Sequence, residues 1–361
     1  MKRLLQAVLG LAISAAALWL TLRGKDLSAI WGATRSADYF WLLPYVGILT
    51  LIHLARTYRW GILLEPVAKL PFAKLNAASA VGFMALMILP FRLGEFARPY
   101  LIAERPRLRV SAALSSVVVE RVADGLFTAG LLVVTLLAVP EGTPGLHFLR
   151  AGGLAVFVVF AALLVFLVLA NRNRALAVRI THRLLDPISP RLAERISGMM
   201  DAFIHGLRLV PSRGKIALFF VLTAVYWGLN AWGMQILARG FDIHLSALQA
   251  FTVLGVLVVG VMIPAGPGMV GTFQAATILG LALFLQKEVV DTRGAAYANV
   301  LWAVQLAQQT ALGLFFLFSR HIRIANIVEA PEEVGEGLEE EEVEYAAETG
   351  APAGSAGKEP R

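Results

Sequence analysis

Long apolar runs dominate this chain of 361 residues and constrain its fold more than any other feature. Most of them reach the roughly 20 residues that a helix needs to cross the hydrocarbon core of a bilayer. The runs cover residues 4–22, 39–58, 75–91, 111–139, 148–170, 216–238, 248–263, 269–285 and 295–318. A soluble domain could not bury so much apolar surface: 58% of the residues are hydrophobic and 16% are charged, against about 25% charged in typical soluble domains. The sequence therefore predicts an all-α polytopic membrane protein.

The basic residues in the short loops predict how the runs cross, because Lys and Arg stay on the cytoplasmic side of a membrane. Basic groups at residues 56–74 and 105–109 flank the apolar segment 75–103. If both groups are cytoplasmic, this segment must enter the membrane and return, as a broken re-entrant hairpin with its tip near residues 89–94. The alternative is that Pro90 only kinks an ordinary helix.

The second half of the chain repeats this plan in the opposite orientation. The loop at residues 171–215 carries nine Lys and Arg against three acidic residues, which is the strongest cytoplasmic signal in the chain. A second broken hairpin is expected over residues 248–285, unless Pro264 only kinks a helix. Paired broken segments at matching places are typical of transporters with inverted repeats. We expect about six full spans plus two broken re-entrant hairpins in an inverted repeat.

Charge divides the chain into a membrane domain and a tail. From Glu329 onward there are eleven Glu and two basic residues, a balance of −9; since the whole chain carries +7, the part before the tail carries about +16. We expect a membrane domain over residues 1–323, with halves of about 1–140 and 146–323. A disordered acidic tail is expected over residues 324–361.

The basic membrane domain points to anionic lipid headgroups as its partner. The sequence shows none of the mixing of aromatic and basic residues on a polar surface that a nucleic-acid-binding protein needs. The absence of cysteine excludes disulfides and thiol catalysis, and no motif requires a metal ion or another cofactor. Lys2 and Arg3 at one end, and Arg320 and Arg323 at the other, predict that both termini are cytoplasmic.

A first group of charged residues lies at the tip of the first hairpin: Arg92, Gly94, Glu95 and Arg98. A charge in the middle of a spanning helix costs about 2.5–3.5 kcal/mol on insertion scales, so such residues mark functional sites. Two guanidinium groups suit a phosphate, because Arg presents a rigid fork to its oxygens, and Gly94 permits a close approach of the backbone. The alternative is an internal ion pair between Glu95 and Arg98.

A second group, Glu120, Arg121 and Asp124, lies in the middle of the fourth run. Glu120 and Asp124 share one helical face, where two carboxylates would repel each other without a cation from another element. Arg92 and Arg98 are the expected source of that cation. Three roles stay open: a structural ion lock between the hairpin and this helix, substrate or proton handling, and enzyme chemistry.

A third group lies at the second break and comprises Pro264, Gly266, Gly268, Gly271, Thr272 and Gln274. Its glycines leave backbone N–H groups bare, and a helix beginning near Gly271 would point its positive end into the membrane. Thr272 and Gln274 could add neutral hydrogen bonds to a phosphate.

Three further residues share a face near the cytoplasmic end of the second run: His53, Arg56 and Arg59. Long basic side chains at such places usually extend to the headgroups. We expect this role for them more than a part in ligand binding.

Together, the segments 90–98, 120–124 and 264–274 resemble the flippase-like membrane domain of lysylphosphatidylglycerol synthases. The resemblance runs over about residues 4–318, and the family also holds stand-alone membrane proteins and relatives linked to isoprenoid lipids or lipid-linked sugars. Many members have Glu where this chain has Gln274, which argues against a titratable role there. The chain ends in an acidic tail and not in an aminoacyl-transferase domain, so lysine transfer is not expected.

The resemblance implies a lipid flippase or transporter, and not an enzyme, that moves an anionic phospholipid or an isoprenoid-phosphate lipid between the leaflets of a bacterial-type cytoplasmic membrane. The headgroup phosphate would bind Arg92 and Arg98, with help from the backbone of residues 266–271. Glu120 and Asp124 would hold the arginines or carry a proton. Two other functions stay open: an integral-membrane transferase with one of these carboxylates as general base, and a non-catalytic scaffold for cell-envelope enzymes. Homo-oligomers are compatible with each of them.

Overall fold

The computed structural model describes most of the chain, in several segments. They are residues 2–89, 94–103, 108–187, 189–190, 211–263, 266–319, 330, 333–337 and 340. Within these segments the regular secondary structure is helical, without a strand. The helices of the first half are α1 (Lys2–Leu22), α2 (Leu27–Arg35), η1 (Tyr39–Trp41), α3 (Leu42–Leu64), α4 (Phe72–Ile88), α5 (Ala97–Ile102) and α6 (Val110–Leu136). Those of the second half are α7 (Leu146–Arg172), α8 (Arg174–Leu185), α10 (Arg213–Arg239), α11 (Ala247–Gly260), η3 (Pro267–Met269), α12 (Thr272–Leu281), α13 (Lys287–Val289), η4 (Val290–Gly294) and α14 (Ala295–Ser319).

The long helices confirm the prediction of an all-α polytopic membrane protein. Four helical stretches are long and apolar enough to cross a membrane: Tyr39–Leu64, Leu146–Arg172, Arg213–Arg239 and Lys287–Ser319. Helix α6 has 27 residues, about 40 Å at 1.5 Å per residue, against about 30 Å of hydrocarbon. Helix α6 differs from these four stretches because it carries the charged residues Glu120, Arg121 and Asp124 near its middle. With the 21 residues of α1, the long helices agree with the six spans expected.

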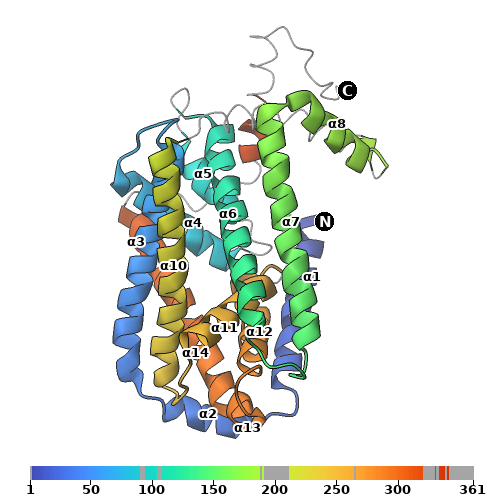
Figure 1. The fold of residues 1–361 in the computed structure, drawn as a ribbon. Helices are drawn as coiled ribbons and strands as arrows, with labels where there is room; N and C mark the ends of the chain where they lie inside the picture. The colour runs from blue at the N-terminus through green and yellow to red at the C-terminus, as the bar shows by residue number, and fades with distance from the viewer. Residues whose placement is uncertain are drawn as a thin grey trace.

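The helices form a bundle in which long and short elements alternate (Figure 1). Helices α3, α6, α7 and α10 run side by side along the length of the molecule. The short helices α4 and α5 lie in its upper half, and α11 and α12 in its lower half. Helix α8 leaves the bundle at the upper end, while α2 and α13 close the lower end.

The first hairpin is formed by α4 and α5, because the chain turns after Ile88 and α5 packs back against α4. Gly94 lies at this turn. A Cβ atom there would overlap the backbone of Ala85 and Leu86, so that only glycine lets the returning chain come this close to α4. The arms therefore stay in one half of the molecule and do not cross it.

The second hairpin is formed by α11 and α12 in the same way. Glycines again permit the contact between the arms: a Cβ on Gly260 would overlap the side chain of Ala276, and Gly280 faces the backbone of Val253. Its tip, at η3, packs against α4 of the first hairpin. The Trp302 indole of α14 holds this tip by donating a hydrogen bond of 2.7 Å to the Gly268 carbonyl.

The packing of the helices relates the two halves as an inverted repeat requires. Helix α3 of the first half packs on α10 of the second. The last helix of each half packs along the long arm of the other half's hairpin: α14 lies along α4, and α6 lies along α11. The largest core cluster fills the space between α3, α10, α11 and α14, around Tyr45, Trp227, Leu254 and Tyr297. The limits of the two halves and of the tail stay predictions.

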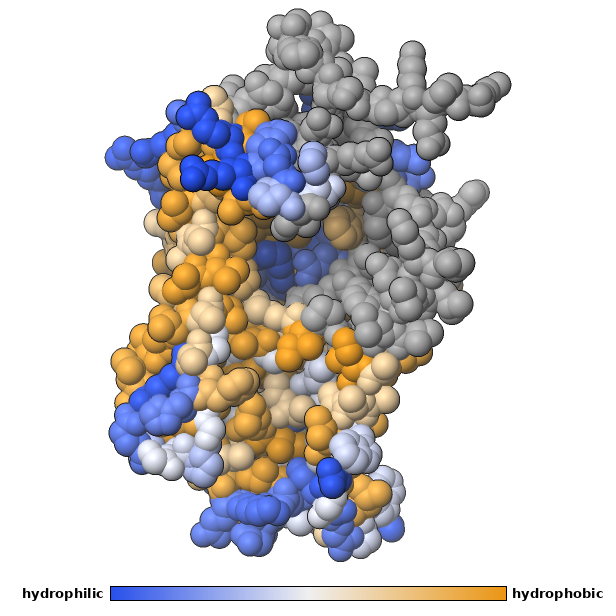
Figure 2. Space-filling view, turned by 90° about the vertical axis from the view of Figure 1, so that its right-hand side faces the viewer, coloured by the Kyte–Doolittle hydropathy of each residue, from blue (hydrophilic) through white to orange (hydrophobic). Residues whose placement is uncertain are grey.

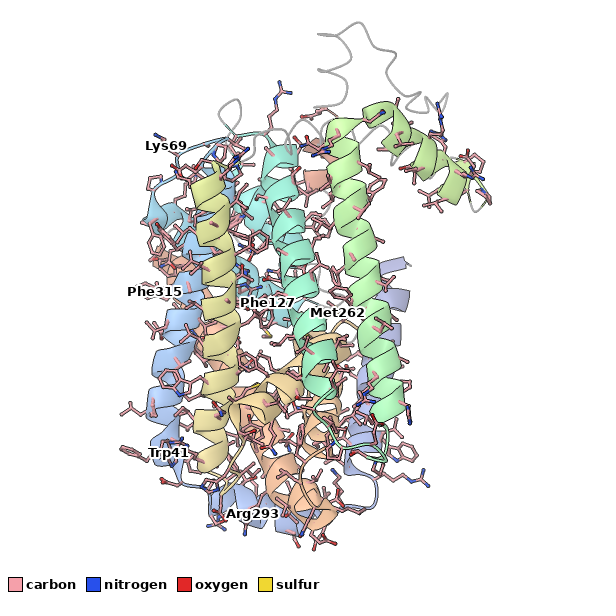
Figure 3. The ribbon with its side chains drawn as sticks, in the orientation of Figure 1. Trp41, Lys69, Phe127, Met262, Arg293 and Phe315 are labelled. Carbon is pink, nitrogen blue, oxygen red and sulfur yellow. The ribbon has the colours of Figure 1, made fainter. Side chains whose placement is uncertain are left out.

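The outer surface carries the apolar side chains that a lipid environment requires. Of the most apolar 18-residue stretch of α7, only 11% is buried, and Phe148, Leu154 and Val158 are exposed on this helix. Figure 2 shows hydrophobic residues over the middle of one face and hydrophilic residues toward both ends. Figure 3 places Lys69 at the upper end, and Trp41 and Arg293 near the lower end.

Candidate functional site: a buried cluster of arginines and carboxylates

Arg59 of α3 and the two carboxylates of α6 form the centre of a buried charged cluster. Arg59 Nη1 donates to Asp124 Oδ1 at 2.5 Å, and Arg59 Nη2 donates to Asp124 Oδ2 at 2.9 Å and to Glu120 Oε1 at 3.0 Å. The side chains of Arg59 and Glu120 have no exposed surface. Charges so far from water need close partners with good geometry, and these contacts supply them. We call this set of three residues the ion lock.

Helix α10 completes the surroundings of the ion lock. Thr223 Oγ1 accepts a hydrogen bond of 3.1 Å from Arg59, and the Trp227 indole donates one of 3.2 Å to Asp124. The guanidinium of Arg59 also lies over the rings of Phe219 and Tyr226, 5.3 and 4.9 Å from their centroids. The ion lock therefore ties α3 and α6 of the first half to α10 of the second.

Arg98 brings the first hairpin to the same cluster. Its Nη1 lies 3.0 Å from Glu120 Oε2, and the residue is 2% exposed. The guanidinium lies over the rings of Trp60 and Phe83, 4.1 and 4.6 Å from their centroids. Its Nη2 and Nε have no hydrogen-bond partner among the described residues. These two nitrogen atoms of Arg98 could therefore donate hydrogen bonds to a ligand.

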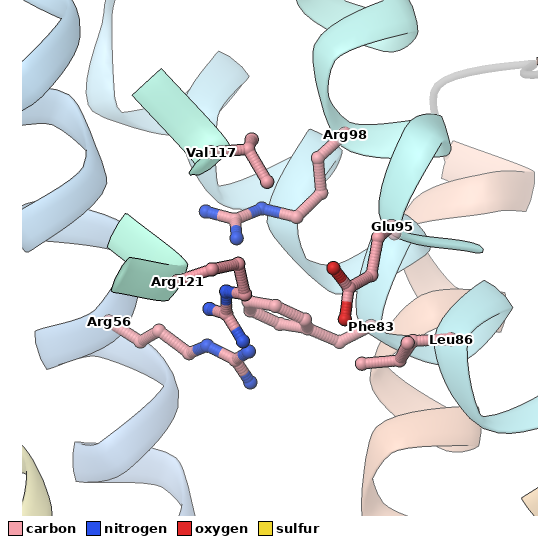
Figure 4. Close-up of a pocket in the computed structure, with 8 residues that line it drawn as sticks. Arg56, Phe83, Leu86, Glu95, Arg98, Val117 and Arg121 are labelled. Atoms are coloured by element: carbon pink, nitrogen blue, oxygen red, sulfur yellow. The ribbon is translucent and has the colours of Figure 1, made fainter. Parts of the chain in front are cut away.

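A small cavity opens beside Arg98, and Arg56, Glu95, Arg98 and Arg121 line it together with apolar side chains. Figure 4 shows the three guanidinium groups converging on the space that the Glu95 carboxylate also faces. Arg121 reaches back to the ion lock, with Nη2 3.1 Å from Glu120 Oε1, and Arg56 lies 3.5 Å over the Phe83 ring. We call this space the arginine cavity.

Positive charge is in excess around the arginine cavity and the ion lock. The described residues supply four guanidinium groups, of Arg56, Arg59, Arg98 and Arg121, and three carboxylates, of Glu95, Glu120 and Asp124. One positive charge is therefore not balanced by these carboxylates. At this depth in a bilayer such a charge is costly unless an anion joins it.

The arginine cavity is more accessible than the ion lock. The side chains of Arg56 and Arg121 are 14% and 23% exposed. Figure 2 shows a hollow in the upper half of the molecule, with hydrophilic residues at its base and hydrophobic surface to the left of it and below it. The partial exposure of Arg56 and Arg121 leaves the cavity within reach of a charged group, whereas Arg59 is fully buried.

The structure brings together two of the three groups predicted from the sequence. Glu120 and Asp124 share a face, and Arg98 is one of their cations, as expected. The main cation was predicted wrongly: Arg59 was expected to extend to the headgroups, and it is buried against both carboxylates. The signal that could have found it is the unpaired acidic pair itself, which needs a cation at the same depth from another helix. Arg92 lies outside the described residues.

In the third group, two backbone N–H groups that were expected to be free for a ligand donate hydrogen bonds within the protein. The Gly266 N–H donates to Ser14 Oγ of α1 at 2.9 Å, and the Gly271 N–H donates to Gln274 Oε1 at 2.8 Å. Gly268 and Gly271 have φ of 69° and 84°, which explains their residue type. Two of these donors are thus occupied within the protein, and the loop packs on α1.

Two further predictions concern this loop. The helix expected near Gly271 does begin there, at Thr272, whose hydroxyl donates to the Met269 carbonyl. Pro264 lies outside the described residues. A substrate-binding role for any residue of the three groups stays a prediction.

No metal site is apparent in the described segments, where no three His, Asp or Glu side chains gather in a group that could hold an ion.

Comparison with known proteins identifies a family that matches most of the chain. The model of the family described as the lysylphosphatidylglycerol synthase TM region matches residues 7–325. A search of curated proteins finds no match. The match covers all three charged groups and both hairpins.

Proposed function

Since the chain belongs to the lysylphosphatidylglycerol synthase TM region family, we propose that it is a lipid transporter. It moves an anionic phospholipid or an isoprenoid-phosphate lipid between the leaflets of the cytoplasmic membrane, with both termini in the cytoplasm. Phosphate is the group that these lipids share, and it is the group that the site selects.

The observation that carries this proposal is the excess of arginine in the arginine cavity. Arg98 is buried, its Nη2 has no hydrogen-bond partner among the described residues, and it faces the same space as Arg56 and Arg121. Guanidinium groups bind phosphate oxygens in paired, charge-assisted hydrogen bonds. A phosphate monoanion would balance the remaining positive charge and would use the Arg98 Nη2 donor. A neutral headgroup could accept a hydrogen bond from the donor but would leave the positive charge unbalanced.

The surroundings of the cavity suit a lipid more than a free anion. Leu86, Phe83 and Val117 form its apolar walls, and hydrophobic residues cover the middle of the face shown in Figure 2. The acyl or isoprenoid chains would remain in the bilayer while the headgroup phosphate binds at the arginines. The cavity has a volume of about 10 Å³, room for about one water molecule, so the side chains that line it would move apart to admit the phosphate. The two halves would then rock about the site, as in other inverted-repeat transporters.

The division of labour among the arginines follows from their partners. Both Nη atoms of Arg59 are engaged by Asp124, Glu120 and Thr223, and its side chain has no exposed surface, so that it holds the helices and does not bind the lipid. Arg98 and Arg121 each reach Glu120 and line the cavity. In this proposal Glu120 positions them, and they bind the phosphate.

A liposome assay tests the proposal. Purified protein is reconstituted with fluorescent phosphatidylglycerol, and movement between leaflets is followed by chemical quenching of the outer leaflet. Replacing Arg98 or Arg121 by Gln should slow this movement roughly 10- to 100-fold, because a hydrogen bond to a charged group contributes about 1.5–3 kcal/mol.

The matched control is Arg239→Gln, which removes a guanidinium that lies over Trp41 at the lower end of the molecule. It should leave the rate unchanged. Equal rates for the wild type and both cavity variants, each verified to be folded, would exclude phosphate binding in this cavity. A covalently altered lipid, detected by mass spectrometry, would instead make the protein a transferase.

A further inference from the structure

A large apolar groove lies on the face of α6 opposite the arginine cavity. It has a volume of about 630 Å³ and runs between α6, α7 and α10. The residues of α6 in its wall include Ala112, Val119, Ala123 and Phe127, whereas Val117 and Arg121 face the arginine cavity. At 100° per residue these two sets lie on opposite sides of the helix. The groove is therefore a separate site.

The length of the groove matches one leaflet of a bilayer. Along α6 it extends from Ala112, near the upper end of the helix, to Phe127, which Figure 3 shows near the middle of the molecule. At 1.5 Å per residue this distance is about 22 Å, and one leaflet together with its headgroup region is about half of a bilayer thickness of about 40–45 Å. A hydrocarbon chain of a lipid in the upper leaflet would thus lie along the groove.

The upper mouth of the groove carries a cation. Asn171 and Arg172, at the end of α7, line it together with Pro211. Among the described residues Arg172 has neither an ion-pair partner nor a hydrogen-bond partner. By contrast, Lys215, a few residues beyond Pro211, is paired with Glu65. A guanidinium at the end of an apolar groove is complementary to a phosphate with a hydrocarbon chain attached.

We propose that this groove binds one anionic phospholipid of the upper leaflet, with a chain along α6 and its phosphate at Arg172. The site does not depend on the transport function proposed above, because it shares no lining residue with the arginine cavity. The walls also touch the ion lock: Phe219, a groove residue, lies 5.3 Å from the Arg59 guanidinium. A bound lipid therefore supports the packing of α10 on this residue.

Native mass spectrometry of the full chain tests the proposal. The protein in mild detergent is incubated with phosphatidylglycerol or with phosphatidylcholine of the same chains. The wild type should retain one phosphatidylglycerol at least tenfold better than phosphatidylcholine. Arg172→Gln should remove this preference, and Ala123→Trp, which fills the groove, should lower the retention of both lipids at least tenfold.

The control is Val158→Trp, which adds the same side chain on an exposed, lipid-facing part of α7 outside the groove. It should bind lipid as the wild type does, and so should Arg98→Gln, whose effect on transport is a separate matter. Undiminished retention by Ala123→Trp, or a dimer of the chain with no bound lipid, would overturn the proposal.

A second measurement covers the case in which Ala123→Trp does not fold. The chain contains no cysteine, so Ala123→Cys and Val158→Cys each introduce a single thiol. Phosphatidylglycerol should slow the alkylation of the thiol at position 123 at least fivefold and leave that at position 158 unaffected. Equal rates with and without lipid at position 123 would likewise overturn the proposal.

Discussion

Arg59 joins three helices through one guanidinium group. Its partners are Asp124 and Glu120 on α6 and Thr223 on α10. Inside a bilayer no water can replace a partner that is lost, so each member of the ion lock depends on the others. The contribution of Arg59 to the stability of the protein can therefore be measured with a single substitution.

Replacing Arg59 by Met should destabilise the protein by about 3–5 kcal/mol, because it leaves two buried carboxylates without their main cation. Thermal unfolding in detergent would measure the loss. The surface pair of Arg150 and Glu141, at 2.6 Å, provides the control: Arg150→Met should shift the unfolding temperature little, since exposed pairs contribute little. Equal shifts for the two variants would contradict a structural role for Arg59.

At the residue scale, the sequence identified the acidic half of the site better than the basic half. Glu120 and Asp124 stand out because a carboxylate pair in an apolar helix needs a partner. Arg59 lies a few residues from a helix end, where a side chain can reach either the headgroups or the interior. Only the packing of α3 against α6 and α10 decides between them, and a single sequence does not contain that information.

The hairpins are the elements that set this fold apart from a simple bundle. Each depends on glycine at the contact between its arms, with Gly94 in the first and Gly260 in the second. Counting charges in the loops predicted both hairpins. It could not predict α2, a short helix of nine residues that Asp26 caps through the N–H groups of Ser28 and Ala29.

The glycines at the tip of the second hairpin were predicted to offer amides to a ligand, but the structure shows two of them in contacts within the protein. Burial and hydrogen bonds show that Gly266 and Gly271 serve the contact with α1, which the sequence did not indicate. A glycine that permits two backbones to meet and one that exposes an amide to a ligand look the same in a sequence.

Gly94→Ala should disrupt the first hairpin, because the added methyl group would overlap the backbone of Ala85 and Leu86. We expect a loss of folded protein, or at least a clear fall in the unfolding temperature, in size-exclusion chromatography and thermal unfolding. Gly47→Ala in α3 is the matched control, since no atom lies within 4 Å of its added carbon; it should be neutral or slightly stabilising. A fully stable Gly94→Ala variant would show that the turn is looser than described.

At the scale of the whole molecule, the first hairpin determines which loops share a side of the membrane. Lys69 precedes α4, and Arg109 follows α5. Because the hairpin returns to its side of origin, both residues should face the cytoplasm. Pro144, in the loop between α6 and α7, should face the opposite side.

Single-cysteine variants at these three positions test the arrangement in intact cells with a membrane-impermeant maleimide. We expect labelling of Pro144→Cys in intact cells, and of Lys69→Cys and Arg109→Cys only after the membrane is opened. A cell-permeant maleimide that labels all three provides the control. Labelling of Lys69→Cys and Arg109→Cys from opposite sides would require an additional full crossing between them.

In the proposed transport, the depth of the arginine cavity would decide how much of the membrane voltage a lipid headgroup crosses. If water of the upper solution reached the arginines, most of the voltage would fall across the lower half of the molecule. A monoanionic headgroup that left the cavity downward would cross nearly all of it, which corresponds to about 2.3 kcal/mol for each 100 mV. With a cytoplasm that is electrically negative, as in respiring cells, the field itself would push the lipid outward. Transport would then be electrogenic, and its direction would need no further energy source.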